Sequence, residues 1–258
     1  MPEPLRTLIV DVETSPFLTW SWHQKSHPQH FMVTKPPILL TWAAKWRGER
    51  KVYDDRLTVK EVLEWNDSAI AESLAELLRE ADAVVAHNAI KFDLPKVNGR
   101  LAHWDLPPLA PIQVIDTLKL AQRELGYPYS NLDYLARQWG FGGKLKVHWE
   151  IWEEVLHGPD RDKALRQMVR YNRRDVQVLD PIFEKVIRYS SNVPRLWKAS
   201  FDGELFCDTC GSTRIEKRGV RRTQAGAYQR YHCLNEKCGK YGRFRTSNAE
   251  PKAAGVPL

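Results

Sequence analysis

RTLIVDVE, residues 6–13, is the stretch of this 258-residue chain that decides its fold. Its aliphatic, β-branched run predicts a buried strand, which Ser15 and Pro16 end. Side chains alternate along a strand, so Asp11 and Glu13 lie on the same face. Neighbouring carboxylates repel each other unless a cation lies between them, and Mg²⁺ or Mn²⁺ prefers such oxygen ligands. The stretch therefore predicts a strand with metal ligands at its C-terminal end.

The rest of the chain predicts an α/β fold, with helices on the faces of a mixed sheet. Alternating strand and helix patterns follow the first strand, whereas the segment 141–152, rich in Gly, Lys and aromatic residues, is predicted to be a functional loop. The expected elements are a hairpin at 38–47 and 50–54, strands at 83–87 and 112–116, and helices at 68–80 (N-cap Asp67 or Ser68), 93–103, 117–125, 131–139 (capped by Ser130, stopped by Gly140) and 161–189 (kinked at Pro181).

Two further acids lie on predicted helices, one at the start of a helix and one within the long helix. Asp93 ends the segment HNAIKFD, in which Asn88 follows a strand and a helix begins. Asp175 ends YNRRD on the long helix, and Tyr171, four residues earlier, shares its helix face. Each pattern alone is more often an ordinary surface feature than a catalytic one. Their conjunction, in this order and on these elements, favours a catalytic site.

Together these patterns resemble the signature of the DEDD 3′–5′ exonucleases, which have the ribonuclease H-like fold and include the proofreading domains of DNA polymerases. The tyrosine matches the DEDDy branch, because the DEDDh branch has a histidine where this chain has Arg170. The resemblance spans residues 6–189 and extends to standalone phage-type members. The matching motifs are Asp11-x-Glu13, Asn88-x-x-x-Phe92-Asp93 and Tyr171-x-x-x-Asp175.

The resemblance implies hydrolysis of phosphodiester bonds by two Mg²⁺ or Mn²⁺ ions. Asp11 is expected to bridge the ions, Glu13 and Asp175 to complete the first site, and Asp93 to serve the second. Tyr171 is expected to orient the attacking water. Asn88 is a candidate substrate contact, Phe92 is expected to pack in the core, and Asp116 has an expected structural role.

Nucleic acid, at 3′ ends or as single strands, is the expected substrate partner, with DNA favoured because the proteins that the chain resembles act in DNA replication or repair. Lys144, Lys146 and Trp149, in the predicted loop, are candidate substrate contacts. Replication or repair proteins are candidate partners. The alternatives are an RNA exonuclease, a structure-specific endonuclease on the same fold, and a nucleic-acid-binding adaptor without catalysis.

The cysteines predict a separate zinc ribbon. All four lie in the last fifth of the chain, as two pairs 22 residues apart, which is typical of a structural Zn²⁺ site. His232 is a possible substitute ligand, although a bystander role is favoured. The expected ligands are Cys207, Cys210, Cys233 and Cys238.

Charge is concentrated in the same segment. Between Gly203 and Asn248 the sequence has ten Lys and Arg residues and four acidic residues. This excess accounts for most of the net charge of +7. Interleaved aromatic residues favour contact with phosphates and bases, although a solvated face or a protein-docking module is the plainer alternative. The sequence has no secretory signal or transmembrane run, so a soluble, cytoplasmic protein is expected. The expected divisions are an exonuclease domain at 1–195, a zinc ribbon at 204–246 and a disordered tail at 247–258.

Overall fold

The computed structural model describes residues 3–20, 32–143, 145, 148–190, 196–197, 205–224 and 226–245. It divides the chain into two compact units, a larger one of Arg6–Val186 and a smaller one that joins Met1–Leu5 to Ile187–Leu258. The expected substrate contacts Lys144 and Lys146, and the expected tail at 247–258, lie outside the described residues.

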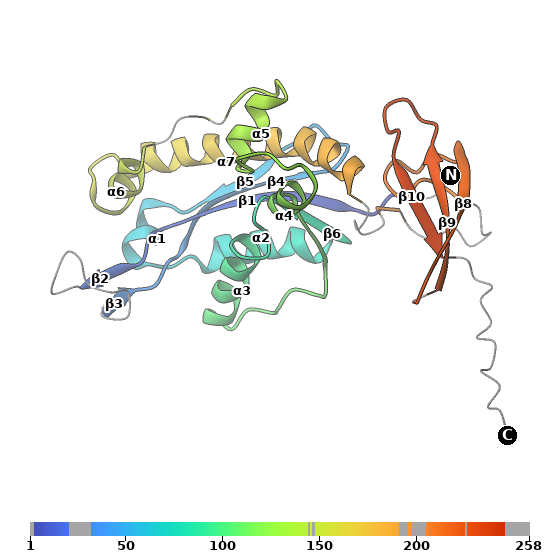
Figure 1. Cartoon of the computed structure of the whole chain (residues 1–258). Coiled ribbons are helices and arrows are strands. Elements are labelled where there is room, and N and C mark those ends of the chain that lie inside the picture. Colours follow the sequence, from blue (N-terminus) through green and yellow to red (C-terminus); the bar gives the residue numbers. More distant parts are fainter. Residues whose placement is uncertain are drawn as a thin grey trace. The chain divides into compact units, whose positions relative to one another are not determined.

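A five-stranded mixed sheet forms the centre of the larger unit (Figure 1). β1 lies in its middle, antiparallel to β4 and parallel to β6, in the strand order β5-β4-β1-β6-β7. A separate hairpin, β2–β3, stands outside this sheet. The strands are β1 (Thr7–Thr14), β2 (Leu18–Trp20), β3 (Met32–Lys35), β4 (Leu39–Trp46), β5 (Tyr53–Arg56), β6 (Ala83–Ala86) and β7 (Gln113–Asp116).

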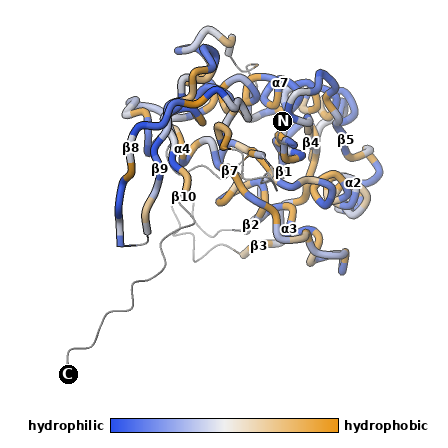
Figure 2. The backbone as a smooth tube through the Cα atoms, turned by 90° about the vertical axis from the view of Figure 1, so that its right-hand side faces the viewer, coloured by the Kyte–Doolittle hydropathy of each residue, from blue (hydrophilic) through white to orange (hydrophobic). Residues whose placement is uncertain are grey.

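Helices cover both faces of this sheet. Figure 1 shows α7 along one face together with α5 and α6, and α2 and α3 on the other. Hydrophobic residues run through β1 and β4 (Figure 2), and they form the main core with the inner sides of α2 and α7. In the described part of the chain, no helix has the length and apolar character needed to span a bilayer. The helices are α1 (Val59–Glu64), α2 (Ser68–Arg79), α3 (Asp93–His103), α4 (Thr117–Glu124), α5 (Leu132–Gln138), α6 (Glu150–His157) and α7 (Arg161–Val186).

The mixed α/β architecture confirms the predicted fold class, but several local predictions differ. The expected functional loop contains α6, which begins at Glu150. Helix α5 is capped by the side chain of Asn131, which accepts from the Tyr134 N–H, and not by Ser130. Helix α7 ends at Val186, before the predicted end at residue 189, and it includes Pro181, where a kink stays a prediction. Helix α1, with a capping box at Thr58, was not expected, because six residues give too little periodicity to predict a helix.

The smaller unit is built on a three-stranded antiparallel sheet in the order β10-β9-β8. Its strands are β8 (Ile215–Thr223), β9 (Gly226–Cys233) and β10 (Tyr241–Arg245), and a short 3₁₀ turn, η2 (Ile187–Tyr189), begins this unit. Tyr231 is fully buried at its centre, where its ring stacks on Phe244 at 4.4 Å. Gly242 pairs with Tyr231, and a Cβ at Gly242 would lie 2.3 Å from the tyrosine ring. Only glycine fits at that position.

Candidate active site and metal-binding cluster

The two carboxylates of β1 face the same side of the central sheet. Asp11 pairs with Ala43 and Glu13 with Thr41 on the neighbouring strand β4. Both acids are half-buried, unlike Val12 between them, which points into the core. The same-face arrangement expected from the spacing of two is therefore present.

Asp93 meets β1 between these two acids. It is the first residue of α3, and its carboxylate Oδ1 accepts a hydrogen bond of 3.3 Å from the Val12 N–H. The parallel pairing of β1 with β6 ends at Ile9, which leaves the next backbone donors of β1 without a strand partner on that side. The Asp93 carboxylate satisfies one of them, as a buried N–H requires. Asp93 is thereby held, almost wholly buried, beside Asp11 and Glu13.

The turn from β6 into α3 sets this position. Asn88 has a φ of 92°, a left-handed conformation that is uncommon for residues other than glycine. Asp116 holds the turn, because its carboxylate accepts hydrogen bonds from the backbone N–H groups of Asn88 and Ile90, and it also caps α4. This is the structural role expected for Asp116. Asn88 is half-buried in the turn, five residues before Asp93.

Helix α7 brings the third motif to the same sheet face. The Asn172 amide Nδ2 donates to Asp11 Oδ2 at 2.5 Å, and its Oδ1 accepts from the Thr41 hydroxyl. Farther along the helix, Asp180 forms an ion pair with Lys45, so α7 follows β4 in direction. Asp175 is fully buried on the stretch of α7 between these two contacts. Tyr171 is half-buried one turn before it.

Asn172, which lies within YNRRD, also belongs to the site, although the sequence motifs did not indicate it. It is fully buried on a helix face that is largely apolar apart from Asp175, with Met168 and Val176 one turn away on either side. A buried amide needs hydrogen-bond partners, so a polar residue on this apolar stripe was the available signal. The partners themselves, on β1 and β4, could not be predicted from the sequence.

A hollow of about 470 Å³ opens beside Glu13. Its lining includes Phe17, Phe92 and Trp149, and Trp149 is 68% exposed. Trp152 also lines it, and its indole N–H donates to the Thr14 carbonyl, which fixes the start of α6 against the end of β1. The expected substrate contact Trp149 thus shares one cavity with an expected metal ligand. Phe92 packs against the core and also lines this cavity.

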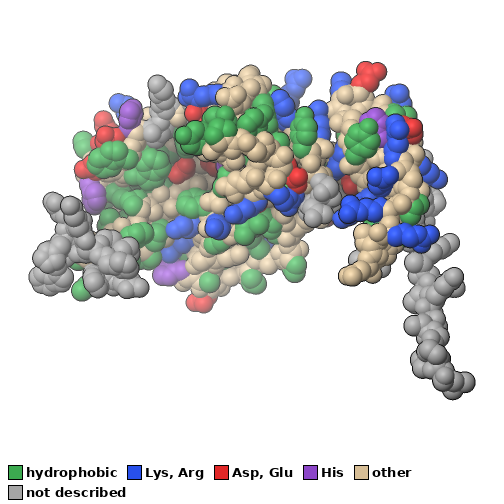
Figure 3. Space-filling model, in the orientation of Figure 1, with side chains coloured by type: hydrophobic (Ala, Val, Ile, Leu, Met, Phe, Trp, Pro, Cys, Tyr) green, Lys and Arg blue, Asp and Glu red, His purple; other side chains and the backbone are tan. Residues whose placement is uncertain are grey.

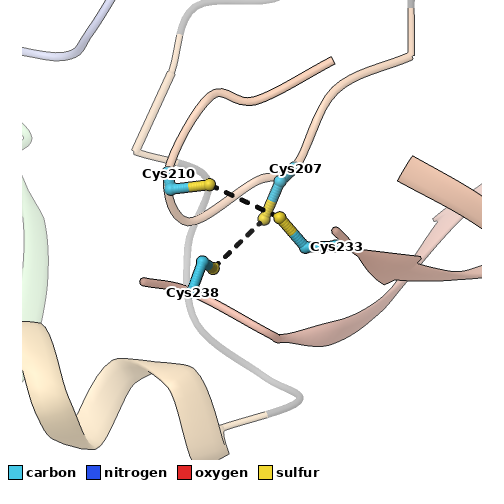
Figure 4. Close-up of side chains that lie close together, drawn as sticks. All are labelled: Cys207, Cys210, Cys233 and Cys238. Carbon is cyan, nitrogen blue, oxygen red and sulfur yellow. Dashed lines mark hydrogen bonds between the residues drawn. The ribbon is translucent and has the colours of Figure 1, made fainter. Parts of the chain in front are cut away.

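The four cysteines of the smaller unit converge as predicted (Figure 4). Their sulfur atoms lie within 4.8 Å of one another, and the Cys207–Cys238 and Cys210–Cys233 pairs are 3.8 and 3.6 Å apart. A tetrahedral ion with Zn–S bonds of about 2.3 Å requires sulfur separations of about 3.8 Å. All four are free thiols. The cluster could therefore hold a zinc ion.

The second cysteine pair reaches the cluster despite its longer spacing. Cys233 is the last residue of β9, and the tight turn begins two residues later, where the Asn235 carbonyl accepts from the N–H groups of Cys238 and Gly239. The extra two residues therefore separate the strand end from the turn. His232 stacks on the Tyr241 ring at 4.4 Å, as expected for a bystander and not a ligand.

The packing of the thiols also favours a cation. Hydrogen bonding from Cys207 lowers the pKa of Cys210 to about 2, whereas burial raises the pKa of Cys233 to about 12. Hydrogen bonds with the Cys207 and Cys210 sulfurs likewise raise the pKa of Cys238. Four thiolates this close repel one another, and a divalent ion that binds them removes that repulsion.

Comparison with known proteins gives the family. A family model described as RNase_H superfamily matches residues 51–187, just over half of the chain. The chain belongs to the RNase H superfamily. The matched range of this RNase H-like protein includes Asp93, Tyr171 and Asp175, whereas β1 precedes it. Membership supports a nuclease, with nucleic acid as its substrate, and RNase H-like nucleases generally use divalent metal ions.

Among solved structures, this RNase H-like chain is similar to the family B DNA polymerase from the hyperthermophilic archaeon Pyrobaculum calidifontis. The two are 16% identical, with a TM-score of 0.49, and the likeness covers 72% of this chain and 25% of the polymerase. The chain thus spans about a quarter of that protein's length. No curated protein matches the sequence.

Proposed function

We propose that the larger unit is a DEDDy-type 3′–5′ exonuclease that hydrolyses DNA with two Mg²⁺ or Mn²⁺ ions. One observation carries the proposal: the carboxylate of Asp93 is hydrogen-bonded to the backbone between Asp11 and Glu13, while Asn172 of the third motif is hydrogen-bonded to Asp11 itself. Segments 80 or more residues apart thus meet at one end of β1. Hard carboxylate oxygens of this kind suit Mg²⁺ and Mn²⁺.

In this proposal, different residues of the chain would bind the metal ions, orient the water and contact the substrate. Asp11, Glu13, Asp93 and Asp175 would hold the metal ions, which supply the activated water and stabilise the leaving oxygen when bound. Tyr171, one turn before Asp175 on α7, would orient the attacking water by a hydrogen bond. Trp149 and Phe17 would stack on unpaired bases in the cavity beside Glu13. Asn88 would contact the substrate from the turn before α3.

Zinc in the cysteine cluster is a separate part of the proposal. Cys207, Cys210, Cys233 and Cys238 would bind one structural Zn²⁺, for which thiolate ligands at tetrahedral separations are typical. The C-terminal zinc ribbon would then be held together by the ion, since few side chains besides Tyr231 form its core.

A cleavage assay tests the nuclease. Wild type, Asp11→Ala and the control Glu76→Gln, which removes an exposed acid from α2, are incubated with 5′-labelled single-stranded DNA, duplex DNA or RNA, with Mg²⁺ or Mn²⁺. We expect a ladder that shortens from the 3′ end for wild type and Glu76→Gln, and none for Asp11→Ala, with DNA cut faster than RNA.

Other outcomes separate the alternatives. Discrete internal cuts would identify an endonuclease, and faster cleavage of RNA would identify an RNA exonuclease. Binding without cleavage under every metal condition would identify an adaptor. Equal activity of wild type and Asp11→Ala would rule out the proposed site.

A further inference from the structure

The sheet of the smaller unit carries a hollow of about 500 Å³, and none of the proposed metal-binding carboxylates lines it. Its walls come from all three strands, and they include four arginines and an exposed tyrosine. Figure 3 shows Lys and Arg side chains gathered over this unit, and Figure 2 shows β8 as mostly hydrophilic. We call this hollow the arginine pocket and define it by Arg218, Arg221, Arg230, Tyr241 and Arg243.

Strand register places Arg221, Arg230 and Arg243 on one face, whereas Arg218 lies in the irregular stretch between Lys217 and Val220. Arg243 lies directly opposite Arg230, and Arg221 pairs with Tyr228, two residues before Arg230 on β9. Like charges directly opposite across strands are destabilising. Glu216 compensates Arg218 at 2.7 Å, but no acid in the described part of the chain forms an ion pair with Arg221 or Arg230. A bound anion would offset this repulsion.

The aromatic residue of the pocket is arranged for stacking. The Tyr241 ring lies flat on His232, with 13° between the ring planes, and Tyr241 is 64% exposed. Arg243 covers Tyr228 at 5.0 Å, which holds the guanidinium over the sheet. Two further residues of this segment are not available, because Lys240 is buried against Thr209 and Tyr231 is buried under Phe244.

We propose that the arginine pocket binds single-stranded nucleic acid, with its guanidinium groups on backbone phosphates and one base stacked on Tyr241. Arginine forks match phosphate oxygens, and an exposed ring accepts any base face. The proposal rests on the proposed function only in taking the bound strand to be the nuclease substrate. Binding itself needs none of the carboxylates.

The test measures binding of a 5′-fluorescein-labelled oligothymidylate to the full chain by anisotropy, over a range of salt concentrations and without added divalent ions. The pocket variant is Arg221→Gln with Arg230→Gln. The control is Lys217→Gln with Arg222→Gln, because these two pair with Tyr231 and Ala227 and so face the other side of the same sheet. Both variants lose two positive charges, and zinc content checks that each is folded.

We expect the pocket variant to bind about tenfold more weakly, with a log–log salt dependence less steep by about 1.4, since each phosphate contact on a single strand contributes about 0.7. The control should bind nearly as tightly as wild type. Tyr241→Ala should weaken binding about fivefold or more, while Tyr241→Trp should not. Equal loss in pocket and control variants, or no loss in either, would overturn the proposal. Unlabelled polyglutamate is a competitor that mimics an acidic protein. If it displaces the labelled oligonucleotide as well as unlabelled oligonucleotide does, the proposal is overturned and the pocket is a site for an acidic protein.

A small phosphodiester separates this result from the nuclease proposal. Hydrolysis of bis(p-nitrophenyl) phosphate with Mn²⁺ needs no strand, so the pocket variant should hydrolyse it at the wild-type rate. Should wild type hydrolyse neither this ester nor DNA while the binding pattern holds, the proposed function fails and the arginine pocket stands.

Discussion

At the scale of single residues, one amide connects three elements of the site. Asn172 on α7 donates to Asp11 on β1 and accepts from Thr41 on β4, and all of this occurs in a fully buried position. The hydrogen bond to Asp11 contributes to the orientation of its carboxylate. Residues that orient metal ligands are commonly as important as the ligands themselves.

We therefore predict that Asn172→Ala lowers nuclease activity by about 10- to 100-fold, through weaker metal binding. Activity should be measured against Mg²⁺ and Mn²⁺ concentration, and part of the loss should be recovered at high metal. Gln177→Ala, at an exposed position of the same helix, is the matched control and should retain wild-type activity. A wild-type metal dependence in Asn172→Ala would show that the amide does not position Asp11.

At the scale of elements, Asp67 joins α2, β4 and α3. Its position before α2 agrees with the predicted N-cap, but its side chain makes no capping bond to that helix. Instead the carboxylate binds the Arg100 guanidinium through two oxygens, at 2.7 and 2.8 Å, and accepts from the Leu39 N–H and the Trp104 indole. The pair is almost wholly buried. It fixes the position of α3, which begins with Asp93.

Asp67→Asn should consequently destabilise the larger unit by about 3–5 kcal/mol, because the buried Arg100 charge loses its counterion. For a unit of this size, that corresponds to a fall in melting temperature of roughly 6–20 °C. The melting temperature is measured by circular dichroism during thermal unfolding. Glu80→Gln removes the exposed Arg6–Glu80 pair and should change stability by less than about 1 kcal/mol. Similar melting temperatures for the two variants would contradict this account.

At the scale of the whole molecule, the two units differ in what stabilises them. The larger unit has an extended core of aliphatic side chains from its sheet and helices. The core of the smaller unit contains Tyr231, two fully buried cysteines and a few partly buried neighbours. A small core of this kind usually needs a metal or disulfides. Metal removal should thus affect the units unequally.

Cys207→Ser should lose the bound zinc, of which we expect about one ion per wild-type chain, and should make residues 205–245 sensitive to protease. The melting transition of the larger unit should persist, as should hydrolysis of bis(p-nitrophenyl) phosphate. Metal analysis and limited proteolysis measure these effects, and His232→Ala, which leaves all four thiols in place, should keep its zinc. Unchanged zinc content in Cys207→Ser would contradict the proposed ligand set.

Much of this protein was predictable from local sequence patterns. The aliphatic run of β1, the helical spacing in α2 and the cysteine pairs each report on a few neighbouring residues, and the structure confirms the fold class they indicated. Helix α1 escaped prediction because its periodicity extends over only six residues, and α6 did so because it begins in a segment rich in Gly, Lys and aromatic residues. The roles assigned to the carboxylates remain predictions.

The sequence alone determined which residue types stand at the strand end, the helix start and the helix face, since alternation and helical periodicity are properties of the local backbone. Only the tertiary structure decided that the Asp93 carboxylate meets the Val12 N–H, that Asn172 meets Asp11, and that arginines from three strands share one face. These contacts depend on strand register and helix packing, and a register shift of one residue would turn every side chain to the opposite face.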